Sequence, residues 1–372
     1  MNPHPVLTPF QLGPHALRNR AVVAPLSRVS APAGGIPTAA MARYYEEYAR
    51  GGFGLIITEG TYTDAHFAQA YTHQPGIIHE AQVAGWRAVV ERIHAAGAKV
   101  FCQLMHAGAL SQCLSQTAAP SAVQPLRTKL AGYGGEGPWP VPKAMTQAEI
   151  QQAVQGFAAS ARRAAAAGFD GVEIHGANGY LIDQFLSDTT NRRRDRYGDS
   201  VAARATLALE VIAAVKAAVP PGFTVGLRLS QGKVNDFDYR WPGGRHTART
   251  WFSLLAQTQV DYLHFASEGT GYQHSCVLED GTVLPQLARA MVGVPVMVNG
   301  GMHAPDLAAQ VLQAGHGDLA ALGTGAIANP DWPNKLAAGE PIQPFQPAML
   351  QPEVTIEATW AHRRRQASLL PV

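Results

Sequence analysis

The chain has 372 residues, of which 47% are apolar, and its formal charge at pH 7 is only +2. The 29 basic residues are spread along the sequence in runs of three at most (Arg192–Arg194, Arg363–Arg365), so we expect neither a nucleic-acid-binding nor a membrane-binding surface. The cysteines Cys102, Cys113 and Cys276 lie far apart without a CxxC pair, which argues against a metal cluster and a disulfide framework.

The first segment carries no export signal. Its sequence, MNPHPVLTPF, lacks a basic stretch followed by an apolar one, and no later stretch is long and apolar enough to cross a bilayer. We therefore expect a cytoplasmic protein with reduced thiols, which works as a monomer or a homodimer. In LTPFQLGPHALRN, a Gly-Pro turn between short apolar runs predicts a hairpin.

Eight short apolar or β-branched runs follow, each typical of a buried strand. They are residues 21–26, 54–59, 99–104, 171–175, 224–229, 262–266, 295–299 and 319–323. Apolar residues recurring at three and four predict helices between them, among them 38–51, 80–97, 146–168 and 200–219. Continuously apolar strands suit a parallel sheet buried on both faces. We therefore predict an α/β fold: a single-domain (β/α)8 TIM barrel over residues 1–372, with its core at 20–340, a tail at 341–372 and the hairpin at its bottom.

One connection is too long for an ordinary strand-to-helix loop. Residues 109–142, which include AGYGGEGPWPVP, are rich in Gly and Pro and follow the third predicted strand. Loops of this length inside a compact domain usually have a function. Because active sites of such barrels lie at the carboxyl ends of the strands, we predict that this loop covers the mouth of the site.

Residues at the carboxyl ends of the predicted strands are mostly neutral hydrogen-bonding groups. In chain order they are Pro25, Leu26, Ser27, Arg28, Glu59, Gly60, Gln103, His175, Asn178, Tyr180, Arg228, Asn299, Gly300, Gly301, Gly323, Thr324 and Gly325. No Asp/His cluster among them has metal-ligand spacing, so no metal is expected. An Arg and two glycine turns among such groups suit a planar heteroaromatic ring with a phosphate tail.

Five segments resemble signature stretches of the Old Yellow Enzyme family, in the same order across nearly the whole chain. They are LTPFQLGPHALRNRAVVAPLSR, QLMHAGALS, GFDGVEIHGANGYLIDQFLSDTTNRRRDRYGDS, VPVMVNGGMHAPDLA and ANPDWPNKL. The resemblance implies a flavin oxidoreductase, an ene-reductase, with non-covalent FMN and with NADPH or NADH as hydride donor. Its partners are then small enones or nitro compounds, whose activated C=C bond is reduced in a ping-pong cycle.

By this resemblance the fourth strand carries the catalytic residues. His175 and Asn178 hydrogen-bond the carbonyl or nitro oxygen of the substrate, where negative charge develops. Tyr180 protonates the α-carbon as the general acid. Tyr71 is expected in the substrate pocket, although an aromatic residue of a surface loop is an almost equal interpretation.

The resemblance also implies how the flavin ring is held. Gln103 can donate and accept at the pyrimidine edge, and Arg228 lies near N1 and O2 of the ring. Pro25, Leu26, Ser27 and Gly60 are the other expected ring contacts. Ser27 stands where the family usually has Thr or Cys, and it keeps a donor for flavin O4.

The phosphate site departs most from the family. Gly323-Thr324 replaces the usual Gly-Arg after the eighth strand, which removes a bidentate guanidinium from the FMN phosphate. We expect backbone N–H groups to form an anion nest instead, from Asn299, Gly300, Gly301, Gly323, Thr324 and Gly325. Met105, a pocket residue, and Ala109 stand where the family often has Trp and Arg, so we expect a wider pocket mouth.

Three other functions compete with this prediction. A Schiff-base aldolase, or a phosphate-binding isomerase, needs its reactive residue at a strand end, and no lysine ends a predicted strand; Lys233 in a loop is the nearest. A larger iron–sulfur flavin dehydrogenase needs a cysteine cluster and further domains. A flavin carrier without catalysis has no use for His175, Asn178 and Tyr180 together. The residues at the strand ends therefore favour an ene-reductase.

Overall fold

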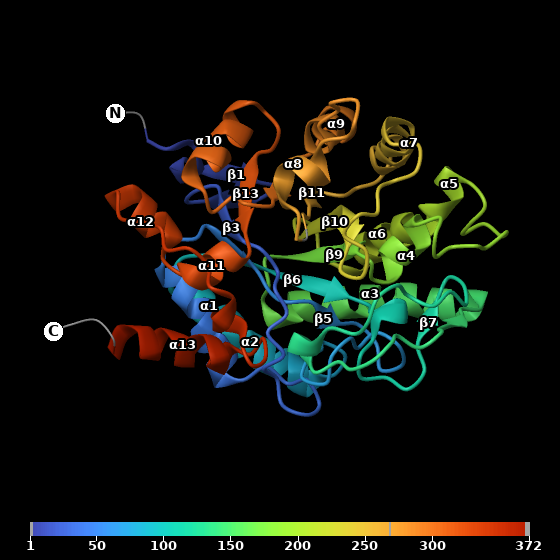
Figure 1. The fold of residues 1–372 in the computed structure, drawn as a ribbon, viewed down its shortest axis with the longest axis horizontal. Coiled ribbons are helices and arrows are strands. Elements are labelled where there is room, and N and C mark those ends of the chain that lie inside the picture. The colour runs from blue at the N-terminus through green and yellow to red at the C-terminus, as the bar shows by residue number, and fades with distance from the viewer. Residues whose placement is uncertain (1–2, 268, 369–372) are drawn as a thin grey trace.

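A closed parallel barrel forms the centre of the molecule in the computed structural model, which describes residues 3–267 and 269–368 (Figure 1). Its strands are β3 (Ala21–Val23), β4 (Leu55–Ile57), β6 (Lys99–Met105), β9 (Gly171–Asn178), β10 (Thr224–Lys233), β11 (Tyr262–Phe265), β12 (Val296–Asn299) and β13 (Leu319–Leu322). Each pairs in parallel with the next, and β13 closes on β3. Because every strand overlaps a predicted run, the (β/α)8 barrel is confirmed. A short β5 (Thr61–Tyr62) extends the pairing of β6.

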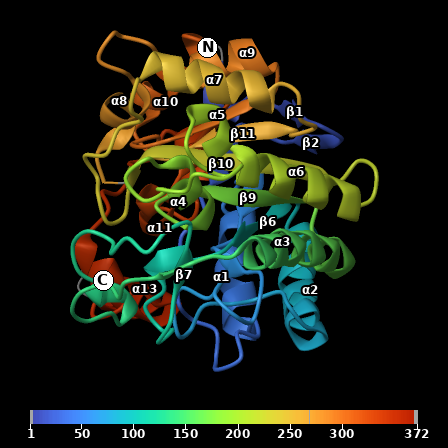
Figure 2. The ribbon, with the colours of Figure 1, turned by 90° about the vertical axis from the view of Figure 1, so that its right-hand side faces the viewer.

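Helices cover the outside of the barrel, and α1 and α2 lie side by side against β4 and β6 (Figure 2). The helices of the repeat are α1 (Ala39–Arg50), α2 (Glu80–Ala95), α3 (Gln147–Ala167), α6 (Thr206–Ala218), α7 (Arg245–Leu255), α9 (Leu284–Val292), α10 (Pro305–Gln313) and α12 (Trp332–Ala338). Shorter ones are α4 (Leu181–Leu186), α5 (Val201–Arg204), α8 (Gly271–Cys276) and α11 (Thr324–Ala328). In the described part of the chain, no helix combines the length and apolar character that a bilayer crossing requires.

Local sequence explains where the longest helix begins and ends. Thr146 and Glu149 form a capping box at the start of α3, in which each side chain accepts a hydrogen bond from the other residue's backbone. The helix ends at Gly168, whose φ of +94° suits a residue without a Cβ atom. The predicted helix over 200–219 is interrupted at Ala205, so it forms α5 and α6 instead of one helix.

The N-terminal hairpin closes the bottom of the barrel, as predicted. Strands β1 (Phe10–Leu12) and β2 (His15–Leu17) pair antiparallel across the turn at Gly13. Leu12 and Leu17 are buried among apolar side chains of the barrel interior, including Phe101 and Tyr262. The hairpin therefore leaves the opposite end, where the strands finish, as the open one.

The long loop after β6 packs over the carboxyl ends of the strands. It contains β7 (Ala118–Ala119), which pairs with β8 (Lys143–Ala144), and a single helical turn at Ala131–Tyr133. Leu130 and Tyr133 of this loop pack on the buried cluster that includes Tyr71, Met105 and Tyr180. The predicted position of the loop, over the mouth of the barrel, is confirmed.

The C-terminal segment returns to the same end of the barrel before α13 (Ile356–Ser368) (Figure 2). The fully buried Arg28 donates from Nε to the carbonyl of Val354 at 3.0 Å and from Nη1 to Tyr44 at 2.7 Å. The backbone N–H of Val354 donates to Gly132 in the long loop. Arg28 therefore ties the C-terminal segment to the end of β3 and to α1, and Val354 ties it to the loop over the site.

Candidate active site

A cavity of about 200 Å³ opens at the carboxyl ends of the strands. Ten predicted site residues line it together, from β6, β9 and β10 and from the segments after β3, β5 and β9: Pro25, Leu26, Ser27, Tyr71, Gln103, Met105, His175, Asn178, Tyr180 and Arg228. Leu130, Tyr133, Val234 and Phe237 complete the lining, and none of these four was predicted. All of them come from loops, which carry no periodic pattern that places a side chain.

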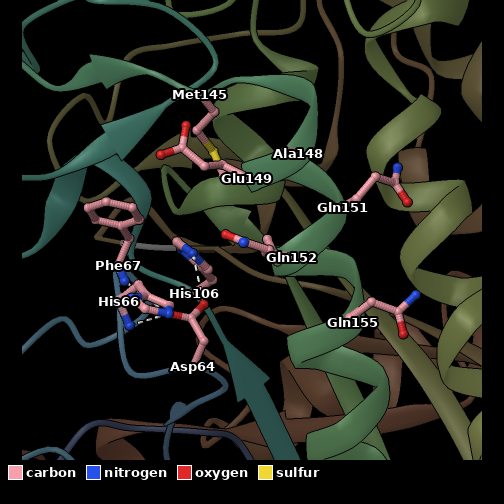
Figure 3. A pocket seen from close by; sticks show the side chains of 11 residues that line it. Asp64, His66, Phe67, His106, Met145, Ala148, Glu149, Gln151, Gln152 and Gln155 are labelled. Atoms are coloured by element: carbon pink, nitrogen blue, oxygen red, sulfur yellow. Dashed lines mark hydrogen bonds and ion pairs between the residues drawn. The ribbon is translucent and has the colours of Figure 1, made fainter.

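A larger hollow of about 570 Å³ lies where the loop after β5 meets the first turns of α3 (Figure 3). Its acidic groups are paired within the protein: Asp64 contacts His106 Nε2 at 3.2 Å, and Glu149 contacts Lys143 at 2.6 Å. None of the predicted site residues lines it. We therefore place the active site in the barrel cavity.

The turn after β9 brings three predicted residues to one side of this cavity. Asn178 (φ +64°) and Gly179 (φ +88°) both adopt the left-handed conformation, which Gly accepts freely and Asn more readily than most residues. Ser230 Oγ accepts a hydrogen bond from the Asn178 N–H at 2.8 Å and holds the turn. As a result His175, Asn178 and Tyr180 face the same space from one short stretch of chain.

His175 is neutral at the cavity wall. Burial, followed by the charge of Arg228, holds the pKa of His175 well below its ordinary value. Its Nδ1 atom is buried and makes no hydrogen bond within the described residues. A neutral imidazole can donate one N–H to a ligand oxygen without bringing a buried positive charge.

Tyr180 is held by a second tyrosine. The hydroxyl groups of Tyr71 and Tyr180 are 2.5 Å apart, and either can donate. Tyr71 is 2% exposed and stacks on Tyr133 with ring centroids 4.6 Å apart. The structure therefore places Tyr71 inside the pocket, which excludes its interpretation as a surface aromatic.

Gln103, Gly60 and Arg228 supply groups that suit a flat heteroaromatic ring. Gln103 Nε2 donates to Glu173 Oε1 at 2.9 Å, which fixes the orientation of the Gln103 amide. A Cβ atom on Gly60 would lie 2.4 Å from Met105 Sδ and 3.4 Å from Gln103 Oε1, so Met105 would have to move to admit a side chain there. These groups fit the flavin ring of FMN: an oriented amide, the buried Arg228 guanidinium and a backbone without a side chain.

Two glycine turns follow β12 and β13 beside this cavity. Gly300 (φ +107°) and Gly301 (φ +83°) need the freedom of glycine, and a Cβ on Gly300 would meet Ser267 at 2.5 Å. Gly323 precedes α11 and borders the cavity-lining Leu26, whose nearest atom would be 3.7 Å from a Cβ at that position. The first N–H groups of such a helix have no partner within it, which fits a phosphate.

Asn299 and His303 change the set of residues expected at the phosphate site. Asn299 Nδ2 donates to the Ala321 carbonyl at 2.9 Å, so its side chain joins the ends of β12 and β13. His303 was not predicted. Its imidazole lies against Gly325, where a Cβ atom would be 3.2 Å from His303 Nδ1. The only signal for His303 in the sequence is its place two residues after the glycine pair.

The interpretation of Lys233 as a loop residue was wrong. Strand β10 continues through an irregular register to Lys233, which pairs with Asn178. The Nζ atom forms an ion pair with Asp183 at 2.8 Å, with both side chains buried, and Lys233 does not line the barrel cavity. Although Lys233 ends a strand, it is therefore not placed for Schiff-base chemistry in this cavity.

Groups of three or more His, Cys, Asp or Glu arranged to hold a metal ion are absent from the described residues. The protein groups around the cavity instead offer neutral donors, one guanidinium and glycine turns. This arrangement can hold a flat heteroaromatic ring and direct donors at an oxygen atom beside it.

Comparisons with known proteins show the family of this chain. The sequence model of the NADH:flavin oxidoreductase / NADH oxidase family matches residues 5–343. A relative from Leishmania infantum, named "Probable flavin mononucleotide-dependent alkene reductase", is 37% identical over 92% of this chain and 93% of its own length. The solved structure of an old yellow enzyme homologue from Zymomonas mobilis superposes with a TM-score of 0.83 at 29% identity, covering 95% and 98% of the two chains.

A second solved structure is that of morphinone reductase in complex with tetrahydroNAD. It has a TM-score of 0.81 and 32% identity, and the match covers 94% of each chain. The family model spans most of the sequence and the relative from Leishmania infantum matches nearly from end to end. The chain therefore belongs to the FMN-dependent NADH:flavin oxidoreductase / NADH oxidase family, the Old Yellow Enzyme family.

Proposed function

We propose that this protein reduces the activated C=C bond of α,β-unsaturated carbonyl or nitro compounds, with NADH or NADPH as reductant. The observation that carries the proposal is that His175, Asn178 and Tyr180 share one cavity with Gln103 and Arg228. When bound there, FMN supplies a two-electron carrier that accepts hydride from the nicotinamide and passes it to the alkene. Because both substrates need the same side of the ring, they take turns, which makes the cycle ping-pong.

His175 and Asn178 bind the substrate oxygen in this proposal. Negative charge grows on that oxygen as the β-carbon is reduced, and donors already fixed in place stabilise it without rearranging. The low pKa of His175 supports the role, because a neutral imidazole costs less to bury than an imidazolium. The turn at Asn178 and Gly179 sets the spacing of the two donors.

Tyr180 is the proposed proton donor. Its phenol proton is transferred to the α-carbon, whereas His175 and Asn178 only donate hydrogen bonds to the substrate oxygen. The hydroxyl of Tyr71 holds the Tyr180 oxygen in place, and Tyr133 in the long loop supports the Tyr71 ring. The mouth loop therefore contributes indirectly to the position of the proton donor.

The remaining predicted residues hold the cofactor. Gln103 and Arg228 bind the pyrimidine side of the ring. Pro25, Leu26 and Ser27, which follow β3, and Gly60, which follows β4, enclose the ring. The phosphate binds at the two glycine turns, through Gly300, Gly301, Gly323, Thr324 and Gly325, with Asn299 joining the strands and His303 as a further donor.

Steady-state kinetics test this function. With NADPH or NADH and 2-cyclohexenone varied together in the absence of oxygen, double-reciprocal plots should give parallel lines, and cyclohexanone should accumulate. An unactivated alkene such as cyclohexene should leave nicotinamide oxidation at its background rate. Intersecting lines would contradict the ping-pong cycle, and equal turnover of both alkenes would contradict the proposed substrate class.

Replacing Thr324 by Arg should tighten FMN binding. A guanidinium supplies the charged hydrogen bonds that this chain lacks, and each such bond contributes about 1.5–3 kcal/mol where the geometry allows. Fluorescence titration of the apoprotein with FMN measures the dissociation constant, and Thr324→Lys is the control for charge without the planar fork. An unchanged or weaker affinity in Thr324→Arg would show that another group, with His303 the nearest candidate, already neutralises the phosphate.

A further inference from the structure

Glu173 lies inside the barrel behind the proposed flavin site, and the function above does not use it. It stands on β9 two residues before His175, so both side chains belong to the same face of the strand. The side chain is fully buried. A carboxylic acid buried in the middle of a barrel strand is costly unless several donors surround it.

Three donors from two other strands meet this carboxylate. Oε1 accepts from Gln103 Nε2 at 2.9 Å, while Oε2 accepts from the Tyr262 hydroxyl at 3.1 Å and from His264 Nδ1 at 2.8 Å. The four residues lie on β6, β9 and β11, so the network connects one half of the barrel interior. Among them, only Gln103 also lines the active-site cavity.

The network pairs a buried carboxylate with a buried histidine. Burial acts to raise the pKa of Glu173, but His264 first, and then Arg228 and Gln103, outweigh it and hold that pKa below its ordinary value. Burial lowers the pKa of His264, despite the adjacent carboxylate. Glu173 is thus ionised, and His264 Nδ1 donates to its Oε2.

The carboxylate also decides which way the Gln103 amide points. A carboxylate only accepts hydrogen bonds, so it selects the NH₂ group of Gln103 and excludes the flipped amide, in which two oxygen atoms would meet. Oε1 is thereby directed away from Glu173, on the side of Gly60. Without the negative charge, both orientations of the amide become accessible.

We propose that Glu173 is a positioning residue for FMN: it fixes the Gln103 amide in one orientation and places a negative charge behind the ring that lowers the cofactor's reduction potential. The inference rests on the proposed roles of Gln103 and Arg228 in holding the flavin. Reduction brings electrons into the ring, and a fixed negative charge nearby makes this less favourable, which opposes the effect of Arg228.

The test compares Glu173→Gln with the wild-type protein, both loaded with FMN. The substitution keeps the size of the side chain and removes its charge. The reduction potential, measured by equilibration with a reference dye, should become more positive. The FMN dissociation constant should rise about 10-fold or more, because one hydrogen bond to a charged group is lost and the amide is free to flip.

Two further variants separate positioning from a general structural role. Glu173→Asp keeps the charge but is too short to retain the bond to Gln103, so it should weaken FMN binding while the potential stays near that of the wild type. Tyr262→Phe removes a donor and leaves both the charge and Gln103 in place, so it should raise neither the potential nor the dissociation constant. Glu173→Asp also serves as the test if Glu173→Gln does not fold.

Unchanged potential and FMN affinity in Glu173→Gln would overturn the proposal, as would unchanged affinity in Glu173→Asp. A Gln103→Ala variant shows whether the inference about Glu173 has failed or whether the proposed role of Gln103 in binding FMN is itself wrong. If Gln103→Ala binds FMN as tightly as the wild type, the proposed role of Gln103 is wrong and the inference falls with it. If Gln103→Ala loses affinity while the Glu173 variants do not, the inference alone is wrong.

Discussion

Replacing Tyr180 by Phe is expected to slow the oxidative half-reaction with 2-cyclohexenone by about 10²–10⁴-fold, the usual cost of losing one general acid. Reduction of the bound FMN by NAD(P)H should remain nearly unchanged, because no proton from Tyr180 is needed until the alkene reacts. The phenyl ring keeps the contact with His175, whose ring centroid lies 5.1 Å from that of Tyr180. Stopped-flow absorbance measures the two half-reactions separately.

Tyr71→Phe is the matched control for this prediction. It removes the hydroxyl that holds Tyr180 at 2.5 Å but leaves the Tyr180 proton in place, so the loss should be smaller and confined to the same half-reaction. His175→Ala and Asn178→Ala should instead impair both halves, if these residues also position the nicotinamide. Equal losses in both half-reactions of Tyr180→Phe, or none in the second, would remove Tyr180 from the role of proton donor.

Replacing Lys233 by Met should lower the free energy of unfolding by about 3–5 kcal/mol, the cost of breaking a buried ion pair from one side. Asp183 Oδ2 forms the ion pair with Lys233 and also accepts a hydrogen bond from the Gly179 N–H at 2.6 Å, so the pair supports the turn that carries Asn178 and Tyr180. Urea denaturation monitored by circular dichroism measures the change. The double variant Lys233→Met/Asp183→Asn should recover most of it, because no unpaired charge then remains.

The loss in Lys233→Met should also grow with pH. Burial raises the pKa of Asp183, although the charge of Lys233 acts to lower it. In Lys233→Met this lowering effect is lost, so the pKa of Asp183 rises further. A carboxyl whose pKa is higher in the folded than in the unfolded state stabilises the fold below the unfolded pKa, and this stability is lost as pH rises toward the folded pKa. Arg50→Met breaks an exposed pair with Glu46 and is the control, with an expected change below about 1 kcal/mol. A loss of that size in Lys233→Met would contradict the prediction.

Sequence alone was enough for the barrel because each strand is a short apolar run bounded by turns, and eight such runs alternate with helical periodicity. The boundaries were less predictable. Strand β10 extends beyond its apolar run to Lys233, since polar residues there pair with the turn after β9. Neither Gly nor Pro marks the break at Ala205, so 200–219 was predicted as one helix.

The candidate site was predictable where it lies at strand ends, because the carboxyl ends of parallel strands meet. Gln103, His175 and Arg228 are brought together in this way. Tyr133 and Phe237 reach the cavity from long loops, whose path depends on tertiary contacts. Glu173 lies deeper in the barrel than the cavity-lining residues. The only sign of its role in the sequence is that it is a charged residue inside a predicted buried strand.

Anaerobic stopped-flow mixing of the purified protein tests the central claim most directly. The protein should carry FMN that is released on denaturation, its flavin absorbance should be lost on mixing with NADPH or NADH, and the absorbance should return on mixing with 2-cyclohexenone. One equivalent of cyclohexanone should form for each equivalent of FMN. Flavin that is reduced by the nicotinamide but stays reduced with the enone would contradict ene-reductase activity, and protein that takes up no FMN would contradict the site itself.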